Sequence, residues 1–250
     1  MKKGKIIFCL VLFMLLSCFV YYYNDYANRK VNVIAINSNT LVEEKEEILE
    51  LPNEHKNKIE DLKEEYGNTD IKAVLRIPNT DKEWIIPQGD DNNFYLRHLL
   101  NKKYNINGVP FLDGRVNLET SRKLLIYGHN DSAIDMPFKE IQNYANEEYL
   151  KNHMYIELET VLGVRKFKIF SVYVETKDFS YYNKITFKTK EEYLKHLTAL
   201  KDKSFYDTGV EVNSNDKILI LQTCSTLKKY QNAKKKFMLV IAKEERIWKV

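Results

Sequence analysis

The chain has 250 residues, and its 39 lysines and arginines against 35 aspartates and glutamates give a formal net charge of +4 at pH 7. This mild excess does not indicate nucleic-acid binding, which needs a dense basic surface, and it suits a protein near an anionic cell envelope. The length allows one large domain, or one domain with a stem.

The N-terminal stretch predicts a membrane anchor. Three lysines within the first five residues precede an uncharged, mostly apolar run over residues 6–23, about as long as the roughly 18 to 20 residues that span a bilayer. The run is too long for a usual cleaved signal and no A-x-A site follows it, so we expect an uncleaved signal anchor. The preceding charges favour a cytoplasmic N-terminus, with the chain from about Asn24 onwards outside the cell.

A competing interpretation of this stretch is lipidation at Cys18. The tetrapeptide LLSC at residues 15–18 loosely resembles a bacterial lipobox, but the bulky Leu16 fits that motif badly. We therefore expect a single-pass protein of the cell membrane, in which residues 1–26 form the cytoplasmic tip and the span.

The chain after the predicted span divides near residue 70. Residues 42–66 are rich in Glu and Lys, have apolar residues at helical spacing and are interrupted by Pro52, which predicts two short helices. We expect residues 27–70 to form a charged helical stem or N-terminal cap, and residues 71–250 to form the main domain.

After Gly67 the chain consists of short runs of β-forming residues. One helical pattern interrupts them over residues 190–201, where Tyr193, Leu194, Leu197 and Leu200 share one face. Eight strands with few helices predict an all-β barrel or sandwich. The predicted strands cover residues 72–78, 83–88, 108–113, 123–130, 154–160, 164–175, 216–224 and 235–247.

A lone thiol ends one of these runs. If the predicted topology holds, Cys224 is the only cysteine in the exported part, because Cys9 and Cys18 lie in the span. An unpaired exported cysteine is a buried inert residue, an intermolecular cross-link or a reactive nucleophile. Free cysteine is among the residue types most often buried, so the cysteine alone leaves these alternatives open.

A thiol becomes a good nucleophile when a base or a cation lies beside it, because the thiolate is the attacking species. His129 is the best candidate for this base, since it ends a strand-like run, follows Gly128 and sits where functional side chains are often displayed. We assign solvated or structural positions to the other histidines: His55 in the stem, His98 and His153 beside apolar runs, and His196 on the polar side of the 190–201 helix.

Alternation of side chains along a strand places the two candidates on comparable faces. His129 shares a face with Tyr127, and Cys224 shares one with Ile220 and Gln222. Both would project at strand ends, beyond apolar positions that fill a barrel. Alternation does not decide whether the two ends meet.

Two motifs resemble those of a known family. YGHN at residues 127–130 and LQTCS at residues 221–225 resemble the histidine and cysteine motifs of sortases, the membrane-anchored transpeptidases of Gram-positive bacteria, and class B fits best. NNFYLRHLL (92–100), GVPFLD (108–113) and the 190–201 helix add to a resemblance that covers roughly residues 70–245. It implies an eight-stranded sortase-type β-barrel with N-terminal helices and one helix inserted between late strands, and neither a metal nor a cofactor.

The resemblance also implies a reaction. Cys224 would attack the backbone carbonyl after a Thr in the C-terminal sorting signal of a secreted protein, giving a thioester acyl-enzyme. His129 would protonate the departing amine and then deprotonate an incoming amine of a peptidoglycan precursor. The expected partners are these two substrates and the membrane, without nucleic acid. The expected substrate-binding residues are Leu96, Tyr181, Gln222 and Thr223.

The sequence departs from the family at the last strand. Sortases have an Arg at its start that holds the substrate and stabilises the oxyanion, and residues 232–240 contain none. Lys236 is the nearest match, but lysine lacks the rigid fork of a guanidinium. Other candidates for this role are Lys234, Lys235, Arg97 and Arg246. At a second departure, Gln222 stands where many class B members have Ser, so substrate preference could differ.

Other enzyme classes fit less well. Papain-like and cell-wall peptidases place the cysteine before the histidine, and L,D-transpeptidases need a cysteine closely followed by Arg in a Gly-rich motif, which TCSTLKK (223–229) lacks. The non-enzymatic alternative is a membrane-tethered surface module, or an inactive sortase relative, in which Cys224 is structural. A buried, unreactive thiol would favour that alternative.

Overall fold

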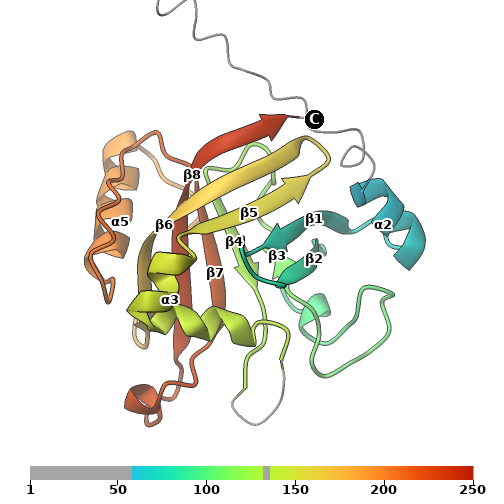
Figure 1. Cartoon of the computed structure of the whole chain (residues 1–250), viewed down its shortest axis with the longest axis horizontal. Coiled ribbons are helices and arrows are strands. Elements are labelled where there is room, and N and C mark those ends of the chain that lie inside the picture. The colour runs from blue at the N-terminus through green and yellow to red at the C-terminus, as the bar shows by residue number, and fades with distance from the viewer. Residues whose placement is uncertain (1–57, 132–135, 250) are drawn as a thin grey trace, which may run out of the picture. The chain divides into compact units, whose positions relative to one another are not determined.

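Eight strands in the described part of the chain form a single sheet (Figure 1). The structure is a computed structural model that describes residues 58–131 and 136–249, of which 246–249 by their backbone alone. The strands are β1 (Ile71–Arg76), β2 (Glu83–Pro87), β3 (Phe111–Leu112), β4 (Lys123–Tyr127), β5 (Tyr155–Thr160), β6 (Gly163–Glu175), β7 (Ile218–Cys224) and β8 (Phe237–Lys249).

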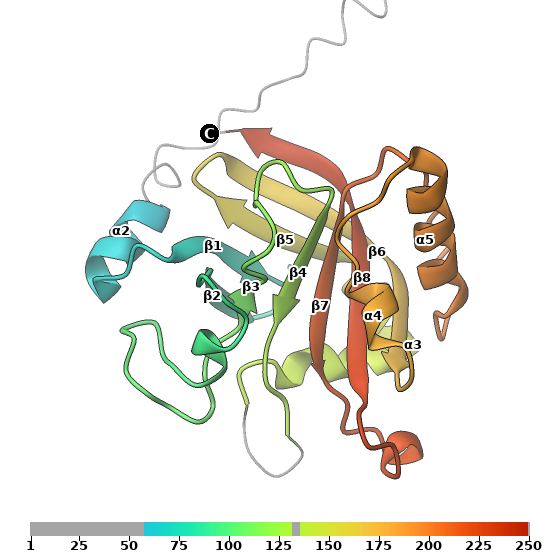
Figure 2. The same ribbon diagram turned by 180° about the vertical axis from the view of Figure 1, so that it is seen from behind.

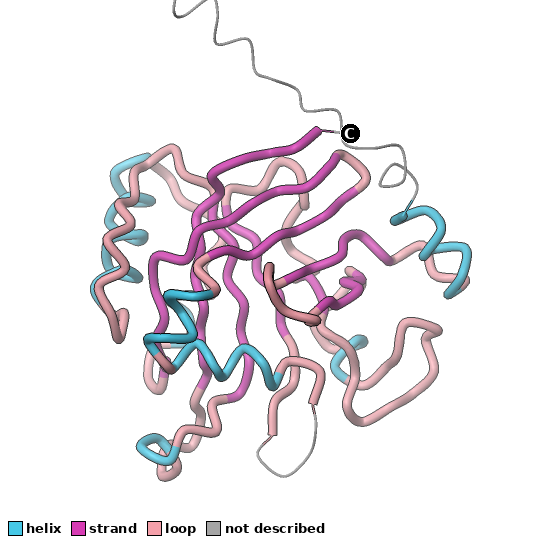
Figure 3. Tube along the Cα trace, viewed as in Figure 1, coloured by secondary structure: helices cyan, strands magenta, loops and turns pink. Residues whose placement is uncertain are grey.

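The strand order closes the sheet almost completely into a barrel. The order is β2-β1-β5-β6-β8-β7-β4-β3, and the edge strands β2 and β3 lie beside each other, as Figures 1 and 2 show. Neighbouring strands are antiparallel except β4 and β7, which are parallel. Parallel neighbours point the same way, so β4 and β7 end at the same edge of the sheet, where loops follow (Figure 3). The predicted eight-stranded barrel is confirmed.

The continuous apolar run of β7 reflects burial on both faces. Residues 218–221 are all buried, because one face packs inside the barrel and the other lies under the segment inserted between β6 and β7. The buried residues of that insertion belong to the same apolar cluster as the barrel core. A strand covered on both sides loses the alternation of apolar and polar residues.

Helices lie around the barrel (Figure 3). The N-terminal helix α2 packs on β1, where Ile59 joins Ile71 and Val74 in a small apolar cluster. The helices are α2 (Lys58–Tyr66), α3 (Glu147–Asn152), α4 (Phe179–Tyr182) and α5 (Lys190–Asp202), with 3-10 turns η2 (Phe94–Leu96), η3 (Lys139–Ala145) and η4 (Lys228–Tyr230).

Helix α5 is the predicted insertion between late strands, and one residue longer than expected. The Thr189 side chain caps its N-terminus by accepting a hydrogen bond from the Glu192 N–H at 3.1 Å, as Ser and Thr do at helix starts. The short helices α3 and α4 were not predicted, because each is too short to show helical periodicity.

The prediction of a single-pass membrane protein is corrected by the structure. Among residues 58–131 and 136–249, no helix is long and apolar enough to cross a membrane. The longest helix described, α5, has 13 residues, whereas a span needs about 20. The predicted span at residues 6–23 lies outside the described residues, as do most of the predicted stem and His55. The domain boundaries therefore stay predictions.

Candidate active site

Parallel pairing sets His129 beside Cys224. Tyr127 pairs with Gln222 in the β4–β7 ladder, and the bond from the Gly128 N–H to the Gln222 carbonyl, 3.1 Å, continues the ladder beyond β4. His129 and Cys224 each lie two residues beyond the Tyr127–Gln222 pair, at equivalent positions on the same face. The structure thus brings together the two strand ends that alternation alone left unconnected.

A backbone carbonyl orients the imidazole of His129. Its Nε2 lies 3.0 Å from the carbonyl oxygen of Leu96, the last residue of η2. Because a carbonyl only accepts, Nε2 carries the hydrogen in this bond, and Nδ1 is the atom of the neutral ring that can take up a proton. Leu96, a predicted substrate-binding residue, is therefore a neighbour of the candidate base.

The thiol of Cys224 is exposed at the end of β7 and has no disulfide partner among the described residues. Although solvent reaches this residue, the protein atoms around it still raise the pKa of the thiol. Asp131 raises it further, and the charge of Lys236 opposes both. The resting thiol is therefore mostly protonated at neutral pH, so a base has to accept its proton before the sulfur can attack.

Buried hydrogen bonds on the opposite face hold the two segments together. The Thr223 hydroxyl donates to the Gly128 carbonyl at 2.8 Å, and the Asn130 side-chain amide donates to the Cys224 carbonyl at 2.9 Å. Thr223 is fully buried and points away from the face of Cys224. This bond gives Thr223 a structural role, and its predicted contact with substrate stays a prediction.

Phe237, not a lysine, lies opposite Cys224 in the β7–β8 ladder. Lys236 directly precedes β8, is half-buried, and donates from Nζ to the Gln231 carbonyl at 3.3 Å. Its charge nevertheless reaches the thiol, because it lowers the pKa of Cys224. Lys236 is therefore close enough for its charge to act on the thiol, although the residue paired with Cys224 is Phe237.

The alternative cations lie in different surroundings. Lys235 is exposed, and its Nζ lies 5.7 Å from the centroid of the Phe179 ring in α4. Lys234 and Arg97 are exposed as well. Arg246 lies nine residues after Phe237 along β8, which is about 30 Å at the rise of a β-strand. This separation argues against a role for Arg246 at the thiol.

The short helix α4 lines the face that carries Cys224. The ring of Phe179 packs edge-on against that of Phe237, with 5.0 Å between centroids. The Tyr182 hydroxyl donates to the side-chain oxygen of Gln222 at 3.3 Å, and Gln222 lies on the Cys224 face, as alternation predicts. The exposed thiol therefore has an aromatic wall on one side.

Tyr181, also predicted to bind substrate, packs its ring against His196 of α5, with 4.8 Å between centroids. The prediction that His196 lies on a polar side of this helix is wrong. His196 is buried, and its Nε2 lies 2.9 Å from Nζ of Lys123, at the start of β4. Helix periodicity could not show this, because the side chains of Lys123, Tyr181 and Phe187 that surround His196 lie outside the helix.

The remaining described histidines have partners elsewhere. His98 stacks on Phe94, whose carbonyl oxygen lies 2.7 Å from its Nδ1, and the Nδ1 of His153 lies 3.3 Å from the Pro78 carbonyl. Neither arrangement involves the thiol. Within residues 58–131 and 136–249, no group of three or more His, Cys, Asp or Glu residues could hold a metal ion.

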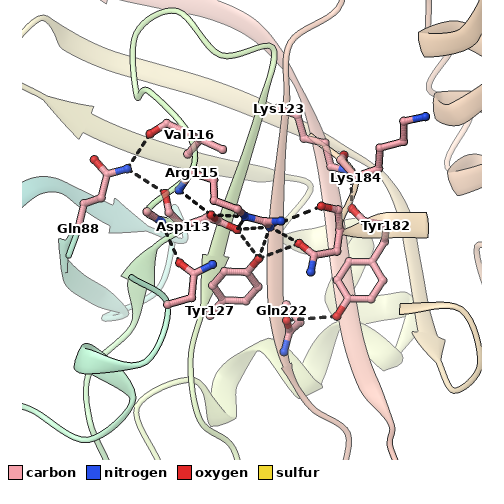
Figure 4. A network of polar contacts seen from close by, with 12 residues as sticks. Gln88, Asp113, Arg115, Val116, Lys123, Tyr127, Tyr182, Lys184 and Gln222 are labelled. Carbon is pink, nitrogen blue, oxygen red and sulfur yellow. Dashed lines mark hydrogen bonds and ion pairs between the residues drawn. The ribbon is translucent and has the colours of Figure 1, made fainter. Parts of the chain in front are cut away.

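A polar network that the sequence did not reveal lies next to this face (Figure 4). The buried carboxylate of Asp113 accepts hydrogen bonds from Arg115 Nη2 and from the Tyr127 hydroxyl, each at 2.6 Å. Burial alone would raise the pKa of Asp113, but these two bonds, together with bonds from the Arg115 backbone and from Asn92, outweigh it and lower the pKa to about 2. Arg115 also donates to the side-chain oxygen of Asn183, directly after α4, so the network joins the barrel to the aromatic wall.

The barrel, with the Cys224 thiol and the His129 imidazole at one end of neighbouring strands, is typical of a cysteine-dependent acyl-transfer enzyme. A thiol and an imidazole at equivalent positions of neighbouring chain segments are the two kinds of group, nucleophile and base, with which such an enzyme works. They stand where β4 and β7 end in a nearly closed eight-stranded barrel, and α4 of the segment inserted between β6 and β7 contacts β7 there through Tyr182 and Gln222.

Comparison with known proteins supplies the family. The sortase domain matches residues 75–245, which is more than half of the chain. The chain therefore belongs to the sortase family, whose members are cysteine transpeptidases. The sortase B of Listeria monocytogenes is 32% identical over 168 residues, which cover 67% of this chain and 68% of that protein.

Solved structures agree with class B. The Clostridium perfringens sortase B superposes with a TM-score of 0.67 at 33% identity, covering 75% of this chain and 99% of that one. The Staphylococcus aureus sortase B–substrate complex has a TM-score of 0.68 at 25% identity, covering 76% of this chain and 86% of that one. The class B resemblance seen in the sequence motifs is confirmed.

Proposed function

We propose that this transpeptidase cleaves the C-terminal sorting signal of a secreted protein after a Thr residue and transfers the protein to an amine of a peptidoglycan precursor. The observation that carries the proposal is the alignment of His129 with Cys224 across the parallel pair β4 and β7. A Staphylococcus aureus relative has been solved as a sortase B–substrate complex, which supports a substrate site on this barrel.

Acylation uses both side chains. His129 accepts the thiol proton, and the sulfur of Cys224 attacks the carbonyl carbon of the scissile peptide bond. The C–N bond then breaks, the departing amine takes a proton from His129, and a thioester remains on Cys224. The raised pKa of the thiol makes this proton acceptor necessary at neutral pH.

Transfer reverses the roles. The incoming amine attacks the thioester, the C–S bond breaks, and His129 takes the proton that the amine loses. We propose Lys236 as the positive charge that stabilises the oxyanion of each step, because its field already reaches the sulfur. Gln222 and Tyr182 stand next to Cys224 on the same face, where the peptide on the acyl side would lie.

The experiment is covalent capture. The full chain is incubated with a library of sorting-motif peptides, and intact-mass and peptide mass spectrometry look for an acyl adduct on Cys224. Cys224→Ala is the matched control and should show neither adduct nor cleavage while keeping its fold. Turnover in the alanine variant would assign the nucleophile elsewhere.

The competing proposal is a surface module or an inactive sortase relative with a structural cysteine. The exposure of Cys224 counts against it, because a structural thiol is expected in the core. A thiol that resists both peptides and small alkylating reagents in the folded chain would favour the competitor.

A further inference from the structure

Two cationic side chains hold three consecutive residues at the end of α4 (Figure 4). Lys123 donates from Nζ to the Lys184 carbonyl at 2.8 Å and also to the Tyr182 carbonyl. Arg115 donates from Nη2 to the Asn183 carbonyl at 3.5 Å and to its side-chain oxygen. Each residue of the segment 182–184 is therefore bound through an oxygen to Lys123 at the start of β4 or to Arg115 in the loop between β3 and β4.

A contribution to folding stability does not by itself explain why a lysine is buried at position 123. Lys123 is 1% exposed, and burial, followed by the charge of Arg115, lowers its pKa well below the ordinary value. An apolar side chain of similar volume would avoid this desolvation. What such a side chain could not do is bind the carbonyls of Tyr182 and Lys184.

The segment held in this way continues from the helix that lines the Cys224 face. Tyr182 is at once bound through its carbonyl to Lys123 and through its hydroxyl to Gln222. Burial, Glu175 and the Cys224 thiolate all raise the pKa of the Tyr182 phenol, which places that phenol within electrostatic reach of the thiol. A shift of the segment 182–184 would therefore move a side chain that borders the nucleophile.

We propose that Arg115 and Lys123 are positioning residues that fix α4 beside the Cys224 face and thereby set how tightly a peptide substrate binds. This inference rests on the proposed function, because it assumes that the peptide lies between α4 and the β4–β7 face. The hydrogen bonds described for the two cations go to neither Cys224 nor His129. Their loss should change peptide binding and leave the chemistry of the thiol intact.

Hydrogen–deuterium exchange on the full chain tests the positioning directly. In Lys123→Met and in Arg115→Gln, the amides of residues 178–184 should exchange about tenfold faster, as expected for local opening, and those of β7 should not change. Arg122→Gln is the matched control, because Arg122 is exposed and donates to the Ser214 carbonyl, outside this segment. Unchanged exchange at 178–184 in both variants would overturn the proposal, whatever the activity of the chain.

Peptide kinetics separate binding from chemistry. Both variants should raise KM by about tenfold with little change in kcat, the pattern of lost ground-state binding. Alkylation of Cys224 by iodoacetamide should keep its wild-type rate. A wild-type KM in both variants would overturn the proposal, and so would a loss of the alkylation rate as large as the loss of peptide turnover. A wild-type chain that cleaves no peptide would instead contradict the proposed function. The exchange result would then decide whether Arg115 and Lys123 position the segment.

A double-mutant cycle tests whether Arg115 acts through Asn183. Asn183→Ala removes the side-chain oxygen to which Arg115 donates. If the two side chains act as one unit, Arg115→Gln should add little to the KM of Asn183→Ala, because interacting residues are not additive. Independent, multiplicative effects on KM would overturn the link between the arginine and α4.

Discussion

Phe237 lies directly opposite Cys224 in the β7–β8 ladder, so the residue of β8 that pairs with the candidate nucleophile is aromatic and carries no charge. Lys236 is the preceding residue and lies just outside β8. Its amine donates to the Gln231 carbonyl, and its charge acts on the thiol from there. The lysine nearest to the family Arg in sequence is therefore not the residue that pairs with Cys224.

Removing the Lys236 charge should change both thiol acidity and turnover. The charge lowers the pKa of Cys224, so in Lys236→Ala the pH profile of iodoacetamide alkylation should move to higher pH. If the charge also stabilises the oxyanion, kcat should fall by the equivalent of about 2 to 4 kcal/mol. Lys236→Arg should keep or raise kcat, because guanidinium can donate two hydrogen bonds.

Lys234→Ala is the control for this prediction, since it removes an exposed positive charge two residues away. It should leave both the alkylation profile and kcat near the wild-type values. A Lys236→Ala enzyme with unchanged kcat would shift the search to Lys235 or Arg97.

His129→Ala should lose about two to four orders of magnitude in kcat/KM, because general acid–base catalysis contributes that much and both steps depend on this imidazole. Steady-state cleavage of a peptide identified by covalent capture provides the measurement. His98→Ala is the matched control, since His98 stacks on Phe94 and contacts its carbonyl. Activity within a few-fold of wild type in His129→Ala would assign the base elsewhere.

The buried His196 should make the fold sensitive to mild acid. Burial and the charge of Lys123 lower its pKa to about 3, whereas in the unfolded chain it is about 6.5. Between these values the unfolded chain binds the additional proton, so the free energy of unfolding should fall as the pH drops below about 6.5, by at most about 1.4 kcal/mol per pH unit. Urea unfolding at a series of pH values between 7 and 5 measures this slope.

His196→Gln keeps a hydrogen-bond acceptor for Lys123 without a titrating ring. This variant should show a flatter dependence of unfolding free energy on pH over the same interval. Equal slopes in wild type and variant would mean that His196 is not the group responsible.

Gly128→Ala should destabilise the protein by about 1 to 3 kcal/mol, the usual cost of inserting a group into a packed core. A Cβ at Gly128 would lie 2.5 Å from Cγ of Phe138, whose ring is fully buried and packs edge-on against Trp84. Gly209→Ala offers a contrast, because no atom lies within 4 Å of a Cβ there and only its positive φ opposes the change. A Gly128→Ala protein with wild-type thermal stability would contradict this packing argument.

Local chemistry made much of this protein predictable from its sequence. Alternating and continuous apolar runs predicted all eight strands, and helical spacing predicted α5, because both periodicities depend on residues close together in the chain. The motifs around His129 and Cys224 indicated the sortase family before any contact was known. The predicted membrane location, by contrast, was wrong, since no helix among the described residues could span a bilayer.

Only the tertiary structure decided how these parts meet. Alternation placed His129 and Cys224 at strand ends, but their alignment required the parallel pairing of β4 with β7. These two strands are separated in sequence by β5, β6 and the helices α3, α4 and α5. The contacts of Arg115 and Lys123 with the segment 182–184 join residues about 60 positions apart. Such contacts depend on strand register and chain crossover, which short-range patterns do not encode.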